Sequence, residues 1–268
     1  ALGKLIDQDD EDIVNPIDRG AKEEDKVKEL RRLSLENEPK VREFLEKLDS
    51  KYGTESKTSF KEPEKILEKA SRPSIKADKP WHDVEHVRDS FRFKTVLENI
   101  EQLPKIAEDL KEAGFTVIKT DTEKVLRPGF WGWRIAAFDL KMPNGQLVEY
   151  YLPLKELEEA KKNGNHELFE KWRNEDPETL SKEEQRQYLS DSYDSYDKYE
   201  AAWQTYLERT KQKPEHVKAA LEATEKIFEK DRAKTEEKNV IKRAESKLIQ
   251  KIKEQKAKEK AKEDDLLR

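Results

Sequence analysis

The sequence predicts an α+β fold: a mixed or antiparallel sheet of four to five strands with flanking helices, followed by a long C-terminal helical arm. Two observations lead to this prediction. Between residues 57 and 152, short segments that alternate apolar and polar residues are interrupted by helical patterns. After Pro153, apolar residues recur only at helical spacing. The strands are therefore expected in the middle of the chain, with helices on either side.

The composition limits what this chain can be. Charged residues make up 43% of its 268 residues and hydrophobic ones only 34%, so we expect a modest core with exposed helices attached. A net charge of −5 does not indicate a general nucleic-acid binder. Without cysteine, the chain has no disulfide, thiolate zinc site or cysteine nucleophile. No apolar run approaches the roughly 20 residues of a membrane span.

The N-terminal part divides at about residue 20. Residues 1–20 are acidic and lack periodicity, which predicts a tail or linker. Residues 21–56 carry two apolar stripes separated by Pro39, and a proline between two stripes predicts two helices. The chain begins Ala-Leu-Gly, from which we expect it to belong to a longer polypeptide.

Residues 57–175 are predicted to form the α+β domain, and residues 176–268 the helical region. The elements follow from hydrophobic period and from turn residues. In order, they are a strand at 57–61, a helix from Pro63, a loop at 71–81, strands at 87–96 and 115–119 flanking an amphipathic helix at 99–113, a short strand near 124–126, an aromatic loop at 129–133, strands at 134–140 and 147–152, and helices at 154–172, 181–210, 217–228 and 240–267.

Glu149 stands out within the last strand, whose other residues are apolar or aromatic. A carboxylate in a buried strand is costly unless it is paired, protonated or bound to a metal. One explanation is a structural pair with Arg134 across the hairpin. The other is a functional site.

Four motifs follow one another along the central segment. Each is weak alone, and their order and spacing make them specific together. They are the lysine-rich run Ser59-Phe60-Lys61-Glu62-Pro63-Glu64-Lys65-Ile66-Leu67-Glu68-Lys69, the Asp-x-x-Arg of Asp89 and Arg92, the loop Gly129-Phe130-Trp131-Gly132-Trp133-Arg134, and the Glu149 strand followed by Asn165-His166-Glu167-Leu168-Phe169-Glu170.

This order resembles the RelA/SpoT-like synthetase family and its toxin relatives, over residues 57–173. There, R-x-K-S-x-x-S-x-x-x-K precedes a D-x-x-R strand, G-Y-R-S-x-H, V-E-x-Q and H-x-L-Y. The resemblance implies a nucleotidyltransferase-like fold and transfer of pyrophosphate from ATP to a 3′-hydroxyl with Mg²⁺. The acceptors it implies are guanine or adenine nucleotides and, for some toxins, the tRNA 3′ end.

The resemblance also implies roles for eight residues. Asp89 and Glu149 would be the catalytic carboxylates and would hold Mg²⁺, in keeping with the preference of this ion for one or two carboxylates plus substrate oxygens. The implied nucleotide-binding residues are Lys61, Lys69 and Arg92 toward the donor phosphates, Phe130 stacking on the acceptor base, His166 near the acceptor, and Arg134 at the position of the loop histidine.

Several positions depart from the family pattern. Ser59 stands where the family has its donor-site arginine, for which Lys57 or Arg88 could substitute. Tyr151 stands at the glutamine that follows the glutamate, and Arg134 at the loop histidine. These departures leave two hypotheses open. The first is an ATP-dependent toxin or effector domain, and the second is an inactive domain of the same fold that binds nucleic acid or protein.

Structural explanations also remain open for several residues. Asp89 could pair with Arg92, His166 could be an exposed helix-start residue, and the loop aromatics could only close the edge of the core. For the active hypothesis, we expect a cytoplasmic site of action, delivery as part of a larger protein, and a neutralising or parent protein that contacts the helical arm. The partners would then be ATP and a nucleotide or tRNA acceptor.

Overall fold

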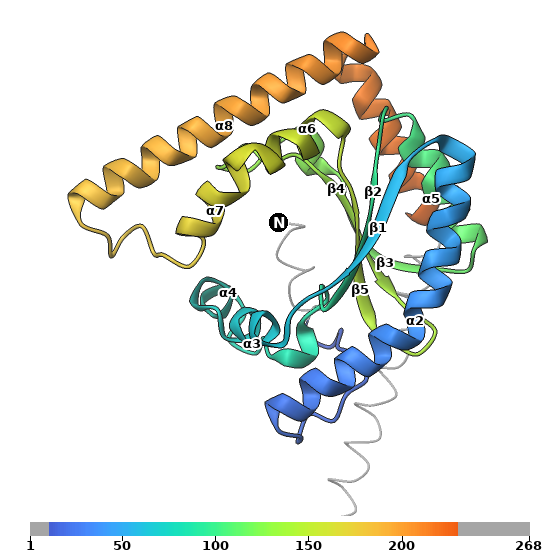
Figure 1. The fold of residues 1–268 in the computed structure, drawn as a ribbon, viewed down its shortest axis with the longest axis vertical. Helices are drawn as coiled ribbons and strands as arrows, with labels where there is room; N and C mark the ends of the chain where they lie inside the picture. The colour runs from blue at the N-terminus through green and yellow to red at the C-terminus, as the bar shows by residue number, and fades with distance from the viewer. Residues whose placement is uncertain (1–10, 230–268) are drawn as a thin grey trace, which may run out of the picture. The chain divides into compact units, whose positions relative to one another are not determined.

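The computed structural model describes residues 11–229, and its described residues up to Thr224 belong to one compact unit (Figure 1). Five strands form one sheet in the order β1-β2-β5-β4-β3. β2 and β5 run parallel, and the other neighbours are antiparallel. The mixed sheet confirms the predicted fold class. The strands are β1 (Glu55–Phe60), β2 (Phe91–Val96), β3 (Thr116–Asp121), β4 (Ala136–Lys141) and β5 (Leu147–Leu152).

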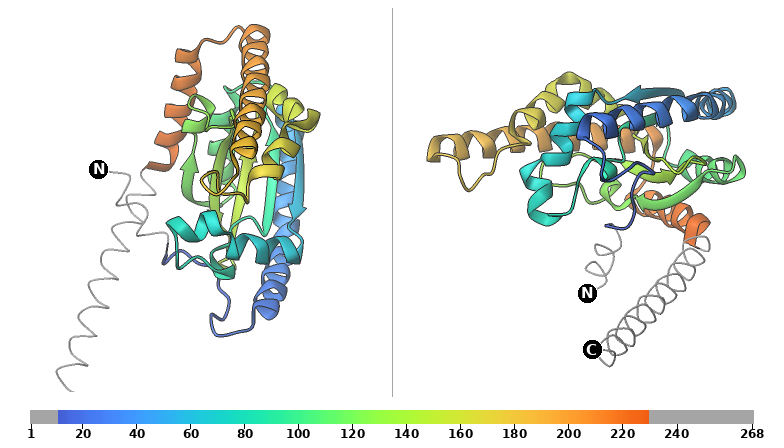
Figure 2. Two further views of the ribbon diagram at one scale, coloured as in Figure 1. Left: turned by 90° about the vertical axis from the view of Figure 1, so that its left-hand side faces the viewer. Right: turned by 90° about the horizontal axis from the view of Figure 1, so that it is seen from below.

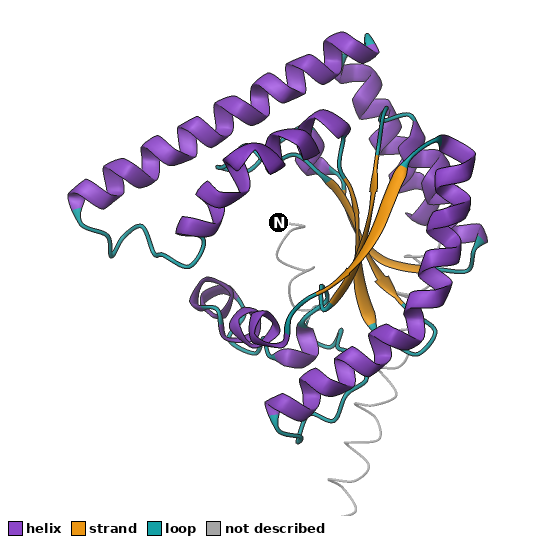
Figure 3. Ribbon diagram, in the orientation of Figure 1, coloured by secondary structure: helices purple, strands orange, loops and turns teal. Residues whose placement is uncertain are grey.

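Helices lie on both faces of this sheet (Figure 3). α2 and α5 cover one face, and α3, α4, α6, α7 and α8 lie on the opposite side (Figures 1 and 2). The helices are α2 (Glu23–Tyr52), α3 (Pro63–Ser71), α4 (Pro73–Asp78), α5 (Gln102–Glu112), α6 (Lys155–Ala160), α7 (His166–Trp172) and α8 (Lys182–Thr210), with short 3₁₀ helices η1 (Val84–His86) and η2 (Glu123–Val125) and a π-helical turn η3 (Lys161–Asn165). Residues 214–229 are also helical. None of the described helices combines the length and apolar character that a membrane span needs.

The face under α2 holds the aromatic core. Phe93 of β2 stacks on Tyr150 of β5, with 4.4 Å between ring centroids. Phe44 of α2 contacts Tyr150 from above and Phe115 beside it. Since side chains alternate along a strand, the residues between these aromatics point to the opposite face. This alternation separates an apolar face from a polar one.

Three predicted elements differ from the structure. Pro39 does not separate two helices, because α2 is continuous through it. Proline costs one helical hydrogen bond, and burial of both stripes along one helix outweighs that loss. The predicted loop at 71–81 contains the short helix α4, which Pro73 begins. The predicted strand near 124–126 is the 3₁₀ turn η2.

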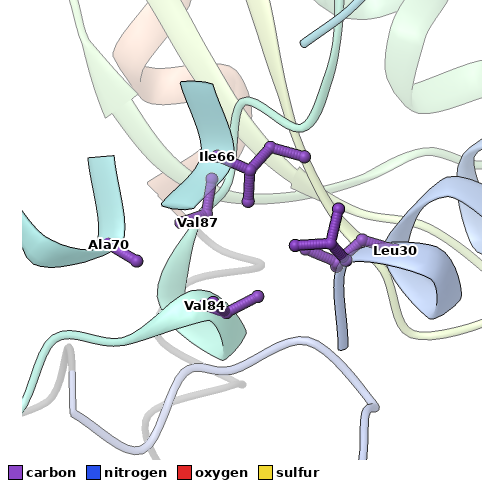
Figure 4. Packing of buried hydrophobic residues seen from close by; sticks show 6 residues of the cluster. Leu30, Ile66, Ala70, Val84 and Val87 are labelled. Carbon is purple, nitrogen blue, oxygen red and sulfur yellow. The ribbon is translucent and has the colours of Figure 1, made fainter. Parts of the chain in front are cut away.

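A small apolar cluster fixes α3 against α2 and against the segment that leads into β2 (Figure 4). Ile66 and Ala70 of α3 pack there with Leu30 of α2 and with Val84 and Val87. Lys69 precedes Ala70 in α3, and Asp89 follows Val87 by two residues. The cluster therefore determines where these two charged groups lie.

The start of the described chain and helix α8 both pack onto the sheet domain. Near the start, the Asn15 amide donates to the carbonyls of Glu85 and Val87, and its oxygen accepts from the Leu147 N–H. Near the end, α8 begins with a capping box at Ser181. It packs on α6 and its Tyr206 hydroxyl accepts from the Ile100 N–H. The helix predicted at 240–267 lies outside the described residues.

Candidate functional site

The face of the sheet opposite α2 carries one continuous row of polar side chains. Strand register places its five members on neighbouring strands at the same level. From β1 across to β3, they are Ser59, Arg92, Glu149, Asp139 and Lys119. Glu149 thus does not point into the apolar core, because it belongs to this polar face.

A cavity of about 690 Å³ lies over β4 and β5 on this face. Glu149 and Tyr151 line it from β5 and Lys69 from α3, while the aromatic loop (residues 129–134) contributes Phe130 and α7 contributes Phe169. Figure 1 shows these elements on the same side of the sheet, with α3 and α4 facing α7. The cavity is large enough for a nucleotide-sized ligand.

A second cavity of about 370 Å³ lies on the β1 and β2 side of the same face. It is strongly cationic, since only Glu158 and Glu167 oppose its basic side chains. Tyr151 lines this cavity as well as the larger one, so it stands between the two. The basic side chains are Lys57, Arg92, Lys94, Lys161 and Lys162, with His166 beside them.

Asp89 is buried between two lysines. Its Oδ2 lies 2.9 Å from Nζ of Lys61, and its Oδ1 lies 2.8 Å from Nζ of Lys69. Burial would raise the pKa of Asp89, but the charges of Lys69 and Lys61 outweigh burial and hold the pKa below its ordinary value. The structure thus pairs Asp89 with these two lysines and not with Arg92, whose Nε donates to Oγ of Ser59 at 3.0 Å.

Glu149 has a different environment. It accepts a hydrogen bond from the Tyr151 hydroxyl. Burial raises its pKa; Lys69 acts in the opposite direction, and the charges of Asp89 and Asp139 raise the pKa further. The two carboxylates are close enough to interact, and their pKa values are shifted in opposite directions. Such a pair is typical of sites in which one carboxylate stays ionised and the other exchanges a proton.

Arg134 does not reach this site. Its guanidinium is buried, donates to the carbonyls of Val125 and Leu126, and forms an ion pair of 2.7 Å with Glu200 of α8. It lines neither cavity, so the structure corrects its placement among the nucleotide-binding residues. It also forms no pair with Glu149. Its partner on α8 is 66 positions away in the chain, too far for motif spacing to reveal.

The other sequence-predicted residues divide between the two cavities. Phe130 is 52% exposed at the larger cavity, where its ring stacks on Tyr188. Arg92 and His166 line the cationic cavity. Nε2 of His166 lies 3.6 Å from Oε1 of Glu170. Lys57 lies beside Ser59 in the cationic cavity, where the arginine substitute was expected.

Arg88 was the other expected substitute, and it points elsewhere. It forms an ion pair with Asp139 at the larger cavity, with 2.6 Å between Nη1 of Arg88 and Oδ2 of Asp139. Sequence reasoning missed Lys94 and Lys161 as cavity residues. Lys94 could have been found, because it lies two positions after Arg92 in β2 and therefore points to the same face of the sheet. Lys161 could not, because it lies in the irregular π-helical turn η3.

The acidic groups fit a magnesium ion shared with a nucleotide. Mg²⁺ requires only one or two protein carboxylates when phosphates and water complete its shell. Each oxygen of Asp89 is paired with one lysine, and a carboxylate oxygen has a second lone pair that a cation could take. Within residues 11–229, no group of three or more potential ligands forms a closed metal site. Asp89 and Glu149 could thus hold Mg²⁺ only together with a substrate.

No family model matches the chain, and neither does any curated protein sequence. Solved structures do match. The small alarmone synthetase 1 from Bacillus subtilis, bound to its product pppGpp, superimposes with a TM-score of 0.51 at 20% identity, over 68% of this chain and 91% of that one. Another structure of the same synthetase gives 0.50 at 19% identity, over the same shares of both chains.

The chain has the fold of a small alarmone synthetase. This likeness confirms the fold that the sequence resemblance implied. The Type VI effector Tas1, solved with its immunity protein, also matches, with a TM-score of 0.45 at 16% identity over 67% of this chain and 95% of that one.

Proposed function

We propose that this domain transfers pyrophosphate from ATP to the 3′-hydroxyl of a nucleotide or of tRNA, as a RelA/SpoT-like toxin or effector does. The observation that carries this proposal is that the pKa values of Asp89 and Glu149 are shifted in opposite directions. Glu149 lines the larger of two adjoining cavities, and Asp89 is buried beside Lys69 of the same cavity. The small alarmone synthetase fold supports it. The product-bound synthetase carries pppGpp, which makes a guanine nucleotide one acceptor class to test.

In this proposal the donor binds in the cationic cavity. Its five Lys and Arg side chains suit the charge of a triphosphate, because phosphoryl-type transfer depends mainly on positioning and charge neutralisation. Lys69 lines the larger cavity beside Asp89, so it would contact the reacting phosphates where the two cavities adjoin. Lys61, on the other oxygen of Asp89, would add positive charge there. Mg²⁺, held by Asp89 and by the phosphates themselves, would neutralise phosphate charge and help to align the phosphates.

The acceptor would bind in the larger cavity. Its base stacks on the exposed Phe130 ring, an arrangement that tolerates different bases. The 3′-hydroxyl lies at Glu149, whose raised pKa makes it a stronger proton acceptor than an ordinary carboxylate. Tyr151 stands between the two cavities and orients this carboxylate through its hydroxyl.

The transfer then proceeds in one displacement. The acceptor 3′-oxygen forms a bond to the β-phosphorus of ATP, and the bond from that phosphorus to the α,β-bridging oxygen breaks. The hydroxyl proton passes to Glu149. The products are AMP and an acceptor that carries a 3′-pyrophosphate.

The test is incubation with γ-labelled ATP, Mg²⁺ and, in separate reactions, GDP, ADP or deacylated tRNA. We expect label on at least one acceptor and none with Glu149→Gln. Absence of label on every acceptor would reject the proposal.

A second candidate is a domain that keeps the fold but only binds nucleic acid or protein. The diversion of Arg134 to Glu200 and the serine at position 59 favour it. Calorimetry separates the two candidates. Binding of ATP·Mg²⁺ that is lost in Asp89→Asn supports the enzyme, while no ATP·Mg²⁺ binding supports the second candidate.

A further inference from the structure

Arg134 ties one end of the aromatic loop to α8. Its Nη2 lies 2.7 Å from Oε2 of Glu200, and its guanidinium lies 4.9 Å from the ring centroid of Trp203. Arg134 is buried, so this contact is shielded from water. The end of the loop that enters β4 is therefore held by α8.

Gly132 brings the middle of the loop against the backbone of α8. Its φ is +80°, and a Cβ at this position would lie 2.7 Å from Cα of Tyr196. Only glycine permits both this φ and this approach. The Gly132 N–H also donates to the Gly129 carbonyl at 2.9 Å, which closes a turn. The turn and the helix are thus packed in direct contact.

The remaining loop residues contact the same helix. Oγ of Ser195 donates to the Trp131 carbonyl at 3.0 Å. The Trp133 and Tyr199 ring centroids lie 5.2 Å apart. Phe130 stacks on Tyr188 with 5.6 Å between centroids. Each residue from 130 to 134 therefore has a partner on α8.

These α8 partners share one face of the helix, because residues 188, 195, 196, 199, 200 and 203 follow helical spacing. The far end of α8 is itself anchored, since Arg209 pairs with Glu156 and donates to the Glu98 carbonyl at 2.7 Å. Tyr206 adds a buried bond to Ile100. The helix can therefore act as a fixed support.

We infer that α8 fixes the conformation of the aromatic loop, and that Ser195, Tyr196 and Glu200 are positioning residues for the acceptor cavity. The loop carries Phe130 and Trp131 into that cavity, so releasing the loop weakens acceptor binding. The effect on the cationic cavity should be smaller, because there the loop contributes the contact of Trp133 with Lys161. This consequence for acceptor binding rests on the proposed function, whereas the fixing of the loop does not.

Hydrogen exchange at the Gly132 amide tests the inference directly. The Ser195→Ala/Glu200→Gln double variant loses the Ser195 hydrogen bond to the loop and the charge of the Glu200 ion pair. At about 1 kcal/mol each, we expect Gly132 exchange to accelerate by at least about tenfold. Amides of α5 in the same sample should keep their rates.

The matched control is Ser192→Ala/Glu208→Gln, which makes the same two substitutions on the same helix. Among the described residues, the Ser192 hydroxyl donates to the Leu189 carbonyl of α8 itself, and Glu208 is exposed. Gly132 exchange should stay within about twofold of wild type, which is far below the effect of one hydrogen bond. Equal acceleration in both double variants, or an unprotected Gly132 amide in the wild type, would overturn the inference.

A kinetic comparison tests the consequence for acceptor binding. With the acceptor that takes label, KM for that acceptor should rise at least about tenfold in Ser195→Ala/Glu200→Gln, and by a larger factor than KM for ATP. An unchanged acceptor KM would refute the positioning role. If the wild type labels no acceptor, the proposed function fails, and the exchange result still decides whether α8 fixes the loop.

Discussion

Lys69 and Asp89 form an ion pair with 2.8 Å between Nζ and Oδ1, in which Asp89 is buried and Lys69 is partly exposed. The pair joins α3 to the entry of β2, above the apolar cluster of Ile66, Ala70 and Val87. It also lies beside Glu149, because the charge of Lys69 acts on both carboxylates. One lysine therefore connects the packing of α3 to the electrostatics of the site.

Removing that charge should destabilise the fold. We expect Lys69→Met to lower the free energy of unfolding by about 2 kcal/mol at pH 7, less than for a fully orphaned charge, because Lys61 still pairs with Asp89. Urea denaturation measures the loss. The control Lys65→Met removes an exposed pair with Glu68 and should cost less than about 0.5 kcal/mol.

The same comparison has a defined pH dependence. The pKa of Asp89 is lower in the folded than in the unfolded state, so ionised Asp89 adds stability above its unfolded pKa of about 3.9. That contribution is lost as pH falls through the folded pKa. The difference in the free energy of unfolding between wild type and Lys69→Met should therefore become smaller below about pH 4. A gap that is constant from pH 7 to pH 3 would contradict the pairing.

Glu149→Gln should make the protein more stable at pH 7. The folded pKa of Glu149 is raised, chiefly by burial, so its ionised form costs stability that glutamine does not. The extra stability of Glu149→Gln over wild type should disappear as pH falls through the folded pKa of Glu149 toward the unfolded value of about 4.3. Urea midpoints at pH 7 and pH 4.5 measure it, with Glu208→Gln as the exposed control. A Glu149→Gln protein that is less stable at pH 7 would mean that Glu149 is a paired structural residue.

Tyr151→Phe should shift the pH dependence of transfer. The Tyr151 hydroxyl bond lowers the pKa of Glu149, so its loss should move the acidic limb of the rate profile to higher pH. Tyr150→Phe is the matched control, because Tyr150 bonds to Thr95 on the opposite face of the sheet. Its profile should keep the wild-type midpoint. Equal profiles for all three proteins would exclude Tyr151 from tuning Glu149.

Gly132→Ala should cost more stability than Gly53→Ala. Both glycines have positive φ, but open space surrounds the Cβ position at Gly53. Gly53→Ala thus measures the backbone cost alone, about 1 kcal/mol. Gly132→Ala adds the clash with Tyr196, and we expect about 2 kcal/mol more. Thermal unfolding of both variants gives the difference, and equal losses would contradict the tight packing of the loop on α8.

Most of the sheet and much of the polar row were predictable from the sequence, because alternation is local. Arg92 with Lys94 and Glu149 with Tyr151 are separated by two positions, which places each pair on one face. The turn at Pro143 and Gly145 marked the β4–β5 hairpin. The order of the motifs predicted that Lys61, Lys69 and Asp89 belong to one site, and the two lysines do lie against Asp89.

What the sequence did not reveal depends on contacts between distant segments. Arg134 pairs with Glu200 of α8 and so lies outside the site, and no local sequence pattern indicates this partner. Pro39 looked like a break, yet burial on both sides of it keeps α2 continuous. In each case tertiary packing outweighed a local signal.

The central claim is that Glu149 serves transfer of pyrophosphate from ATP to an acceptor hydroxyl. The most direct measurement counts AMP and 3′-pyrophosphorylated acceptor formed by wild type, Glu149→Gln and the exposed control Glu208→Gln. We expect equal amounts of AMP and modified acceptor from wild type and Glu208→Gln, and a loss of at least about a hundredfold in Glu149→Gln. Modified acceptor formed at the same rate by Glu149→Gln, or AMP without modified acceptor, would contradict the account.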